Sequence, residues 1–269
     1  MRLWVVLAAL FLAAAAALFF LLVGPSPEAE APPPANATVV AYVKMGGLAF
    51  RVYATVENNF TRGLFDLGNG QYYVFDKELH IYKYCAEESC IPVVLNFTQL
   101  FQPPPLEEVR VVNDTKEVRC FRGRYMGAEV EWCKNKKWGY VASVKTPSSA
   151  AAVESFEPRF DRERWFSALY NALIDKIDEG VKAEITYVNK TEFTIVAAAK
   201  RQTRVKIDVA TLTSDTTCTE ATLRPGEVKA FRCPILCVPT CGAWVKTEGP
   251  ARLLVIVGGC LKRPGCPGG

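Results

Sequence analysis

The sequence predicts a mainly β protein with one amphipathic helix, organised as two disulfide-stapled antiparallel β domains behind a single N-terminal transmembrane helix. Three observations lead to this fold class. The chain opens with an apolar run, residues 3–23, and most of the remaining chain alternates apolar and polar residues with a period of two. Ten cysteines divide into an even set of four and an even set of six.

The N-terminal run has the length of a membrane-spanning helix. Leu3–Val23 contains twenty-one residues without a charge, an amide or a proline. At about 1.5 Å per residue, such a helix crosses a hydrocarbon core of roughly 30 Å, whereas the apolar part of a secretory signal is shorter, about 7–15 residues. We therefore expect residues 1–24 to be an uncleaved anchor that contacts the membrane through residues 3–23. A signal peptide cleaved near Ala29-Glu30-Ala31 is the alternative.

The flanking charges predict the orientation of the anchor. Arg2 precedes the apolar run, and Glu28 and Glu30 follow it. The positive-inside tendency then leaves the N-terminus in the cytoplasm and the C-terminal body outside a single-pass cell-membrane protein. Cleavage of the segment would make the protein secreted instead. Residues 25–36 are rich in proline and form an extended spacer.

Composition limits the class of protein. Half of the chain is apolar and 22% is charged, as in globular proteins, and the net charge is only +4. This balance gives no reason to expect a nucleic-acid partner. Three methionines and one histidine stand beside many lysines, arginines and glutamates, a composition similar to that of proteins from thermophiles.

Five Asn-x-Ser/Thr triplets predict glycosylation of an exported chain. They exceed the number expected by chance from nine asparagines, and most fall in the spacer, at strand ends or in turns, where a glycan does not disturb packing. The predicted sites are Asn36, Asn59, Asn96, Asn113 and Asn189.

Residues 37–146 form the first predicted extracellular β domain. Alternating runs at 38–45 and 48–57 flank Gly46-Gly47 as a hairpin. Further strands pair across turns expected at Asn113-Asp114 and Asn135-Lys136. Nearly the whole region therefore reads as antiparallel strand.

Residues 147–182 are predicted to be a linker followed by the amphipathic helix. The helix is expected to extend from Asp161, which can cap its start, to Gly180, which suits a left-handed end. Apolar residues spaced by three and four give it one face, which we expect to pack on a sheet. That face consists of Trp165, Phe166, Leu169, Tyr170, Leu173, Ile174 and Ile177.

Residues 183–269 are predicted to be a second extracellular domain that resembles a β-sandwich of immunoglobulin type, because short strands alternate with turn signals. Arg224-Pro225-Gly226-Glu227 is a turn sequence between two of the strands. The continuous apolar run 253–257 is typical of a central strand covered on both faces.

The cysteines of an exported chain predict disulfides between nearest neighbours. A turn at Met126-Gly127 places Cys120 opposite Cys133, and a turn at Pro225-Gly226 places Cys218 opposite Cys233 on a hairpin, close enough to bridge. The full predicted set is Cys85–Cys90, Cys120–Cys133, Cys218–Cys233, Cys237–Cys241 and Cys260–Cys266.

The sequence contains no catalytic or metal motif, so we expect no catalytic residue, no metal and no cofactor. Cys233, Cys237 and Cys241 are separated by three residues, not the two that are common in zinc and iron–sulfur ligand pairs. His80, the single histidine, lies in a predicted strand, and no serine lies in a Gly-x-Ser-x-Gly turn. Adjacent acids such as Asp178-Glu179 point to different sides of an element.

These features favour a non-enzymatic binding or scaffolding protein of the cell envelope, with a protein or glycan partner at the cell surface. The cysteine-bearing, aromatic-rich strands of the first domain resemble the half-barrels of lipoprotein carriers of the LolA type, without a motif specific to that family. A carrier of a hydrophobic ligand in a half-barrel pocket is therefore the first alternative. A surface glycan hydrolase that uses two distant carboxylates is the second.

Overall fold

The computed structural model describes residues 35–45, 47–57, 60–87, 89–93, 107–125, 127–189, 191–210, 215–234, 241–249 and 251–256. The predicted anchor, Asn59, Asn96, Cys237, Cys260 and Cys266 lie outside these ranges. No helix within them is long and apolar enough to cross a membrane. The chain divides into two compact units, one of residues 1–74 and 82–161 and the other of residues 75–81 and 162–269.

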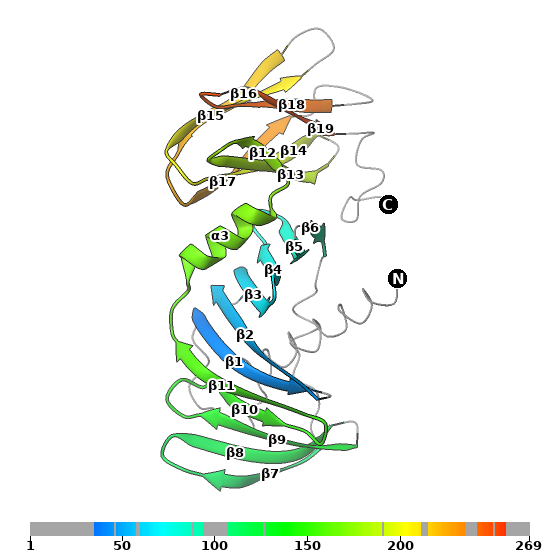
Figure 1. Ribbon diagram of the computed structural model, residues 1–269, viewed down its shortest axis with the longest axis vertical. Coiled ribbons are helices and arrows are strands. Elements are labelled where there is room, and N and C mark those ends of the chain that lie inside the picture. The colour runs from blue at the N-terminus through cyan, green and yellow to red at the C-terminus, as the bar shows by residue number, and fades with distance from the viewer. Residues whose placement is uncertain are drawn as a thin grey trace. The chain divides into compact units, whose positions relative to one another are not determined.

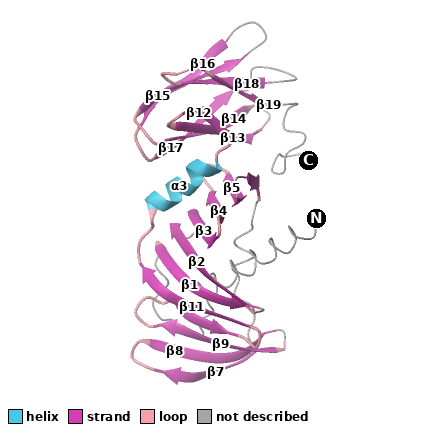
Figure 2. Cartoon of the chain, in the orientation of Figure 1, coloured by secondary structure: helices cyan, strands magenta, loops and turns pink. Residues whose placement is uncertain are grey.

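The fold is mainly β, and every described strand pair is antiparallel, as the sequence predicts (Figures 1 and 2). The first unit is built on an eleven-stranded sheet with the order β6-β5-β4-β3-β2-β1-β11-β10-β9-β8-β7. Its strands are β1 (Ala37–Met45), β2 (Leu48–Glu57), β3 (Arg62–Gly68), β4 (Gln71–Asp76), β5 (Ile81–Ala86), β6 (Ser89–Pro92), β7 (Glu107–Asp114), β8 (Val118–Tyr125), β9 (Ala128–Asn135), β10 (Val141–Lys145) and β11 (Ser149–Glu157).

The first and last strands of this sheet in the sequence, β1 and β11, lie side by side in its middle (Figure 1). Two series of hairpins, β1 to β6 and β7 to β11, extend from them in opposite directions. The two series therefore end at opposite edges of the sheet, at β6 and at β7.

One face of the central strands is aliphatic. Val39, Ala41 and Val43 alternate along β1, and Ala54 and Val52 of β2 lie opposite the first two of them. Directly opposed residues share a face of the sheet, and none of these five side chains is more than 2% exposed. The period of two thus produces a buried apolar row, as predicted.

Two predictions for this region need correction. The turn expected at Asn113-Asp114 lies two residues later, at residues 115–117. Thr115 fixes it there, because its hydroxyl accepts a hydrogen bond from the Val118 N–H and its own N–H donates to the Val118 carbonyl. The start of the predicted linker, 147–182, contains β11, since its small residues pair with β1 and β10. Small residues suit a strand between two close neighbours as well as they suit a linker.

The second unit contains a sandwich of two four-stranded sheets, as expected for its C-terminal part. The sheet orders are β12-β13-β14-β17 and β16-β15-β18-β19. Apolar side chains of both sheets form one core, with Ile195, Ile207 and Val245 fully buried. The strands are β12 (Asp175–Asp178), β13 (Val181–Val188), β14 (Glu192–Ala199), β15 (Thr203–Ala210), β16 (Asp215–Leu223), β17 (Glu227–Pro234), β18 (Cys241–Lys246) and β19 (Arg252–Ile256).

The amphipathic helix is shorter than predicted. α3 spans Arg162–Ala172, and the next residues form β12, which pairs with β13. Trp165 and Leu169 are buried on the predicted face, but Ile174 is 64% exposed and Gly180 lies in the β12–β13 turn. The helical spacing continued past residue 172 by coincidence, because the residues of β12 also place an apolar side chain at position 177. Hydrogen bonds from Lys182 Nζ to the carbonyl oxygens of Asn171 (3.2 Å) and Leu173 (3.0 Å) cap the helix end.

The apolar run near the C-terminus is also placed differently. β19 is an edge strand of its sheet, not a central one, and Leu253 is 39% exposed. The run resembles a central strand in sequence because it lacks polar residues. The position of a strand in a sheet depends instead on which strands pair with it, and β18 is the only described partner of β19.

Three of the five predicted disulfides are present: Cys85–Cys90, Cys120–Cys133 and Cys218–Cys233. The first two join directly opposed residues of a hairpin, as the turn arithmetic predicts for Cys120 and Cys133. The third pair is correct, but its predicted hairpin is not. β16 and β17 belong to different sheets, so the bridge from Cys218 to Cys233 connects the two layers of the sandwich.

A charged group is buried on the outer face of the β16-β15-β18-β19 sheet. The Asp208 carboxylate accepts hydrogen bonds from Thr217 Oγ1 (2.8 Å) and Lys246 Nζ (2.7 Å), with Lys206 Nζ at 3.4 Å. Burial raises the pKa of Asp208, but the hydrogen bonds from Lys246 and Thr217 and the charge of Lys206 outweigh it and hold that pKa below its ordinary value. The carboxylate thus ties three strands together in its ionised form.

Replacing both cysteines of the inter-sheet bridge, Cys218→Ser with Cys233→Ser, should lower the free energy of unfolding by about 3 kcal/mol, because the bridge closes a loop of 15 residues. The matched control, Cys85→Ser with Cys90→Ser, opens a loop of five and should cost about 2 kcal/mol. Denaturant unfolding of the oxidised proteins measures both. A larger loss in the control would contradict the loop-entropy account.

Asp208→Asn should lower the free energy of unfolding at pH 7 by about 1–3 kcal/mol, because it removes the charge from a buried hydrogen-bonded group. The folded pKa lies below the unfolded value of about 3.9, so the carboxylate stabilises fully above that value and less as pH falls through the folded pKa. The difference from wild type should therefore shrink below about pH 4. Glu163→Gln, at an exposed helix position, is the control for the loss of one negative charge and should change the free energy of unfolding at pH 7 less than Asp208→Asn does.

Candidate functional site

The surface of the first unit carries a pocket of about 450 Å³ in which three aromatic side chains meet, Trp138, Tyr140 and Phe156. We call it the aromatic pocket. Val153 is a further apolar residue of the lining. The polar residues of the lining are Lys116, Glu117, Asn135, Lys137, Glu154 and Ser155. The residues come from the turn before β8, the β9–β10 connection and β11.

The β9–β10 connection is fixed by its own hydrogen bonds. The side-chain oxygen of Asn135 accepts the N–H groups of Lys137 (3.1 Å) and Trp138 (3.0 Å), and its backbone N–H donates to the Tyr140 carbonyl (2.8 Å). Gly139 has φ +67°, in the left-handed region that other residues rarely adopt. This conformation lets Trp138 and Tyr140, on either side of the glycine, both contribute to the pocket.

A β-bulge in β11 supplies the third ring. Val40 of β1 lies opposite Ser155, but the next residue, Ala41, lies opposite Val153, so Glu154 is an extra residue in the strand. Phe156 therefore shares a sheet face with Val153, although three positions separate them. The extra residue is held in place by Arg51, whose Nε lies 2.8 Å from the Glu154 carboxylate.

The rings form adjoining flat surfaces. Tyr140 and Phe156 stack with centroids 4.1 Å apart and an interplanar angle of 18°, and Trp138 is tilted by 39° to Phe156 at 6.1 Å. The ammonium group of Lys137 lies 4.9 Å from the Trp138 ring centroid, a cation–π distance. All three rings are half-buried, and burial raises the pKa of Tyr140.

Several polar groups of the lining have no partner within the described part of the chain. They are the side chains of Lys116, Glu117 and Ser155, the Tyr140 hydroxyl and the Trp138 indole N–H. A pocket with flat apolar surfaces and unpaired donors and acceptors can bind a ligand that offers both kinds of contact. It holds no arrangement of nucleophile and base.

The neighbouring turn is kept rigid by charge. Asp114 pairs with Lys136 and with Arg119, whose Nε lies 3.6 Å away. The hydrogen bond from Lys136, with the charges of both cations, holds the pKa of Asp114 below its ordinary value. The backbone N–H of Lys136 also donates to the Glu117 carbonyl. These contacts join the Lys116-Glu117 turn to the β9–β10 connection, so both sides of the pocket are fixed relative to each other.

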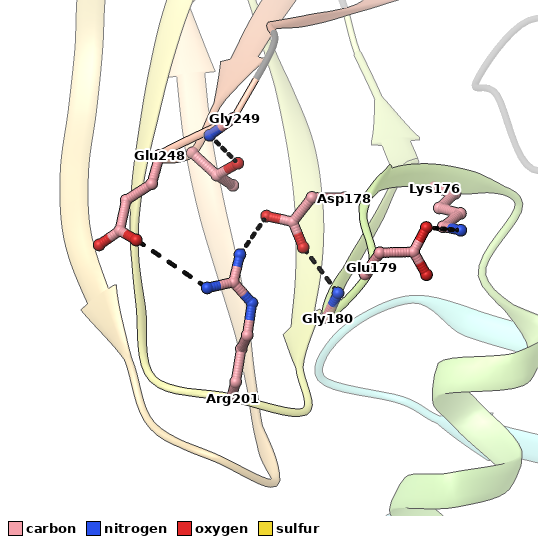
Figure 3. Close-up of polar contacts among 8 residues, drawn as sticks. Lys176, Asp178, Glu179, Gly180, Arg201, Glu248 and Gly249 are labelled. Atoms are coloured by element: carbon pink, nitrogen blue, oxygen red, sulfur yellow. Dashed lines mark hydrogen bonds and ion pairs between the residues drawn. The ribbon is translucent and has the colours of Figure 1, made fainter.

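A second polar cluster, in the second unit, has a structural explanation (Figure 3). The Arg201 guanidinium lies between Asp178 (3.2 Å) and Glu248 (3.9 Å), and the second Asp178 oxygen accepts the Gly180 N–H (2.7 Å). Burial raises the pKa of Asp178, but the hydrogen bonds from Gly180 and Thr247 and the Arg201 charge outweigh it and lower that pKa. The cluster joins three turns at one end of the sandwich.

Adjacent acids in this cluster point to different partners, as the sequence predicts. Asp178 binds Arg201, whereas Glu179 accepts a hydrogen bond from Lys176 (2.6 Å) (Figure 3). Three of the described carboxyl groups, those of Asp114, Asp178 and Asp208, have a pKa that is displaced downward. The general acid of a glycosidase requires the opposite displacement, so these three carboxylates stabilise the fold.

The larger depression of the second unit, about 880 Å³, combines charges of both signs. It lies between the start of α3 and the β16–β17 turn and is lined by Arg162, Glu163, Phe166 and Arg224, among others. Glu227, also in the lining, accepts the Arg224 N–H at 2.8 Å. Since its acids and bases balance and only one ring contributes, it favours no class of ligand.

The remaining predicted site residues are dispersed. Asn113 is exposed on β7, whereas Asn36 and Asn189 are half-buried, and the Asn189 side-chain oxygen accepts the Thr191 and Glu192 N–H groups. His80 lies in the turn before β5, not in a strand, and stacks on Tyr187 at 4.7 Å. Within the described ranges, no three His, Cys, Asp or Glu side chains cluster as metal ligands. The pairing of Cys241 stays a prediction because Cys237 is not described.

Sequence reasoning missed the aromatic pocket. It predicts a strand after the turn at Asn135-Lys136, whereas Trp138 and Tyr140 lie in the β9–β10 connection, before β10 begins at Val141. The signal that would have found them is a turn-forming asparagine followed by two aromatic residues around a glycine, Asn135-Lys-Lys-Trp-Gly-Tyr140. Phe156 has no comparable signal, because the bulge that orients it depends on the pairing with β1.

Gly139→Ala should lower the free energy of unfolding by about 1–2 kcal/mol and displace Trp138, because alanine resists the left-handed conformation. Gly127→Ala is the matched control, since Gly127 has φ +79° in the β8–β9 turn with open space around it. Both variants should lose similar stability in denaturant unfolding. Only the first should shift the Trp138 indole N–H resonance, and an unshifted resonance would show that Gly139 does not position the ring.

No protein-family model matches the chain, and neither does a curated protein sequence. Among solved structures, the chain is similar to PNGF-II in a C2 crystal form, with 8% identity and a TM-score of 0.32 over 65% of this chain. It spans 43% of the PNGF-II chain. It is also similar to the Pseudomonas aeruginosa MucA/MucB complex structure, with 10% identity, a TM-score of 0.36 and coverage of 82% of this chain and 86% of that chain. Similarities this low carry no conclusion about the chain.

Proposed function

We propose that the protein is a non-enzymatic binding protein of the cell exterior, held at the membrane by residues 3–23, which binds its partner in the aromatic pocket. One observation carries the proposal. Three large rings remain partly exposed beside polar side chains that have no partner within the described part of the chain. A surface that served only the fold would gain by covering the rings, at about 25 cal/mol per Å² of apolar area.

The disulfides support the exterior location. Bridges such as Cys120–Cys133 persist in oxidising compartments and are rare in the reducing cytosol. The exposed sequon at Asn113 is open to glycan addition on an exported chain. The anchor, its orientation and the glycans belong to the proposal.

A carrier of a hydrophobic ligand is the second candidate, favoured by the aliphatic face of the central strands. Val39, Ala41, Val52 and Ala54 of that face are covered in this structure, so a ligand would have to replace what covers them. Native protein that yields a stoichiometric lipid on organic extraction would favour the carrier over the surface binder.

The full chain in lipid nanodiscs, incubated with solubilised envelope material from its own organism, tests the surface binder. Tyr140→Ala should lower the amount of retained material at least tenfold, because central aromatic residues often contribute more than about 1.4 kcal/mol to binding. Tyr125→Ala, which removes a 37%-exposed ring from the end of β8, is the matched control and should bind as wild type does. Equal retention by wild type and Tyr140→Ala would refute the site.

A further inference from the structure

We infer that the ligand of the aromatic pocket is a saccharide. The inference rests on the proposed function, because it names the chemical class that the same pocket binds. A sugar ring has a C–H face that packs on an aromatic ring, and its hydroxyl groups both donate and accept hydrogen bonds. The aromatic rings of the pocket match the C–H face, and the polar side chains of its rim match the hydroxyl groups.

The apolar requirement comes from the rings. Tyr140 and Phe156 are stacked on each other 4.1 Å apart, and Trp138 lies at 39° to Phe156. Stacking occupies one face of Tyr140 and one face of Phe156, so each ring has one further face, and an aromatic face matches the C–H face of a sugar unit. The volume, about 450 Å³, lies within the range of small-molecule sites.

The polar requirement comes from the rim. Lys116 donates only, Glu117 accepts only, and the Ser155 and Tyr140 hydroxyls do both, and none has a side-chain partner within the described part of the chain. An aliphatic ligand would cover these groups without pairing them, and each group would then lose its hydration without compensation. A ligand with many hydroxyl groups pairs with all of them.

β8, β9 and β10 each have a neighbour on both sides in the sheet order, so they offer no edge for strand addition by a peptide. Residues 153–156 of β11 pair with β1 and lie beyond the register shared with β10, which ends at Ala152. A strand added beside them would pair backbone groups and leave the side chains of Lys116 and Glu117 without partners. The acids and bases of the rim also balance, which gives no preference for a strongly charged ligand. The rings and the rim together favour a neutral, hydroxyl-rich, ring-shaped ligand.

Calorimetric titration of the full chain in nanodiscs with neutral hexasaccharides tests the inference. The probes are β-1,4-linked glucose, β-1,4-linked N-acetylglucosamine and α-linked mannose. We expect at least one to bind wild type, with a loss of tenfold or more in Tyr140→Ala and a smaller loss in Tyr140→Phe, which keeps the stack and lacks the hydroxyl. Tyr125→Ala should bind as wild type does, and thermal unfolding checks that each variant is folded.

Binding of every hexasaccharide with the same affinity by wild type and Tyr140→Ala, or no binding at all, would overturn the inference. Competition separates it from the proposed function, because a saccharide that occupies the pocket must displace the partner bound there. If envelope material binds in a Tyr140-dependent manner and none of the hexasaccharides displaces it, the pocket binds a partner of another class and the saccharide inference fails alone. If envelope material never binds in a Tyr140-dependent manner, both fail.

Discussion

The pairing of β1 with β11 is the constraint on which the first unit depends. It joins two series of hairpins, β1 to β6 and β7 to β11, that would otherwise be separate small sheets. Its register therefore sets the position of one series relative to the other. The same pairing contains the bulge at Glu154, so the feature that unites the sheet also sets the position of Phe156. Fold and pocket are therefore consequences of one ladder of backbone hydrogen bonds.

The sequence predicts correctly those features of the structure that depend on residues close together in the chain. The hairpin at Gly46-Gly47 follows from alternation and a glycine turn, and the Cys120–Cys133 bridge follows from counting outward from a turn. The Cys218–Cys233 pair shows the limit of this reasoning, because the same arithmetic gave the right partners for strands of different sheets. Two cysteines near a sharp connection approach each other whether the chain continues in one layer or crosses to the next.

Three of the errors share a cause: each involves an element whose identity or position depends on the strand that pairs with it. Residues 149–157 are a strand because β1 lies beside them, and Asp175–Asp178 is a strand because β13 does. The edge position of β19 depends in the same way on strand order. The pocket combines both situations, with Trp138 and Tyr140 set by a local turn and Phe156 set by the distant strand β1.

The central position of β1 has a mechanical consequence under the proposal that residues 3–23 hold the protein at a membrane. A pull on the chain before Ala37 acts along β1, which is bonded to β2 on one side and to β11 on the other. Force applied along such a strand loads both ladders in shear, so many hydrogen bonds must fail together before the strand moves. An edge strand at this point would peel away one bond at a time. The strand that follows the proposed anchor is thus held on both sides against tension.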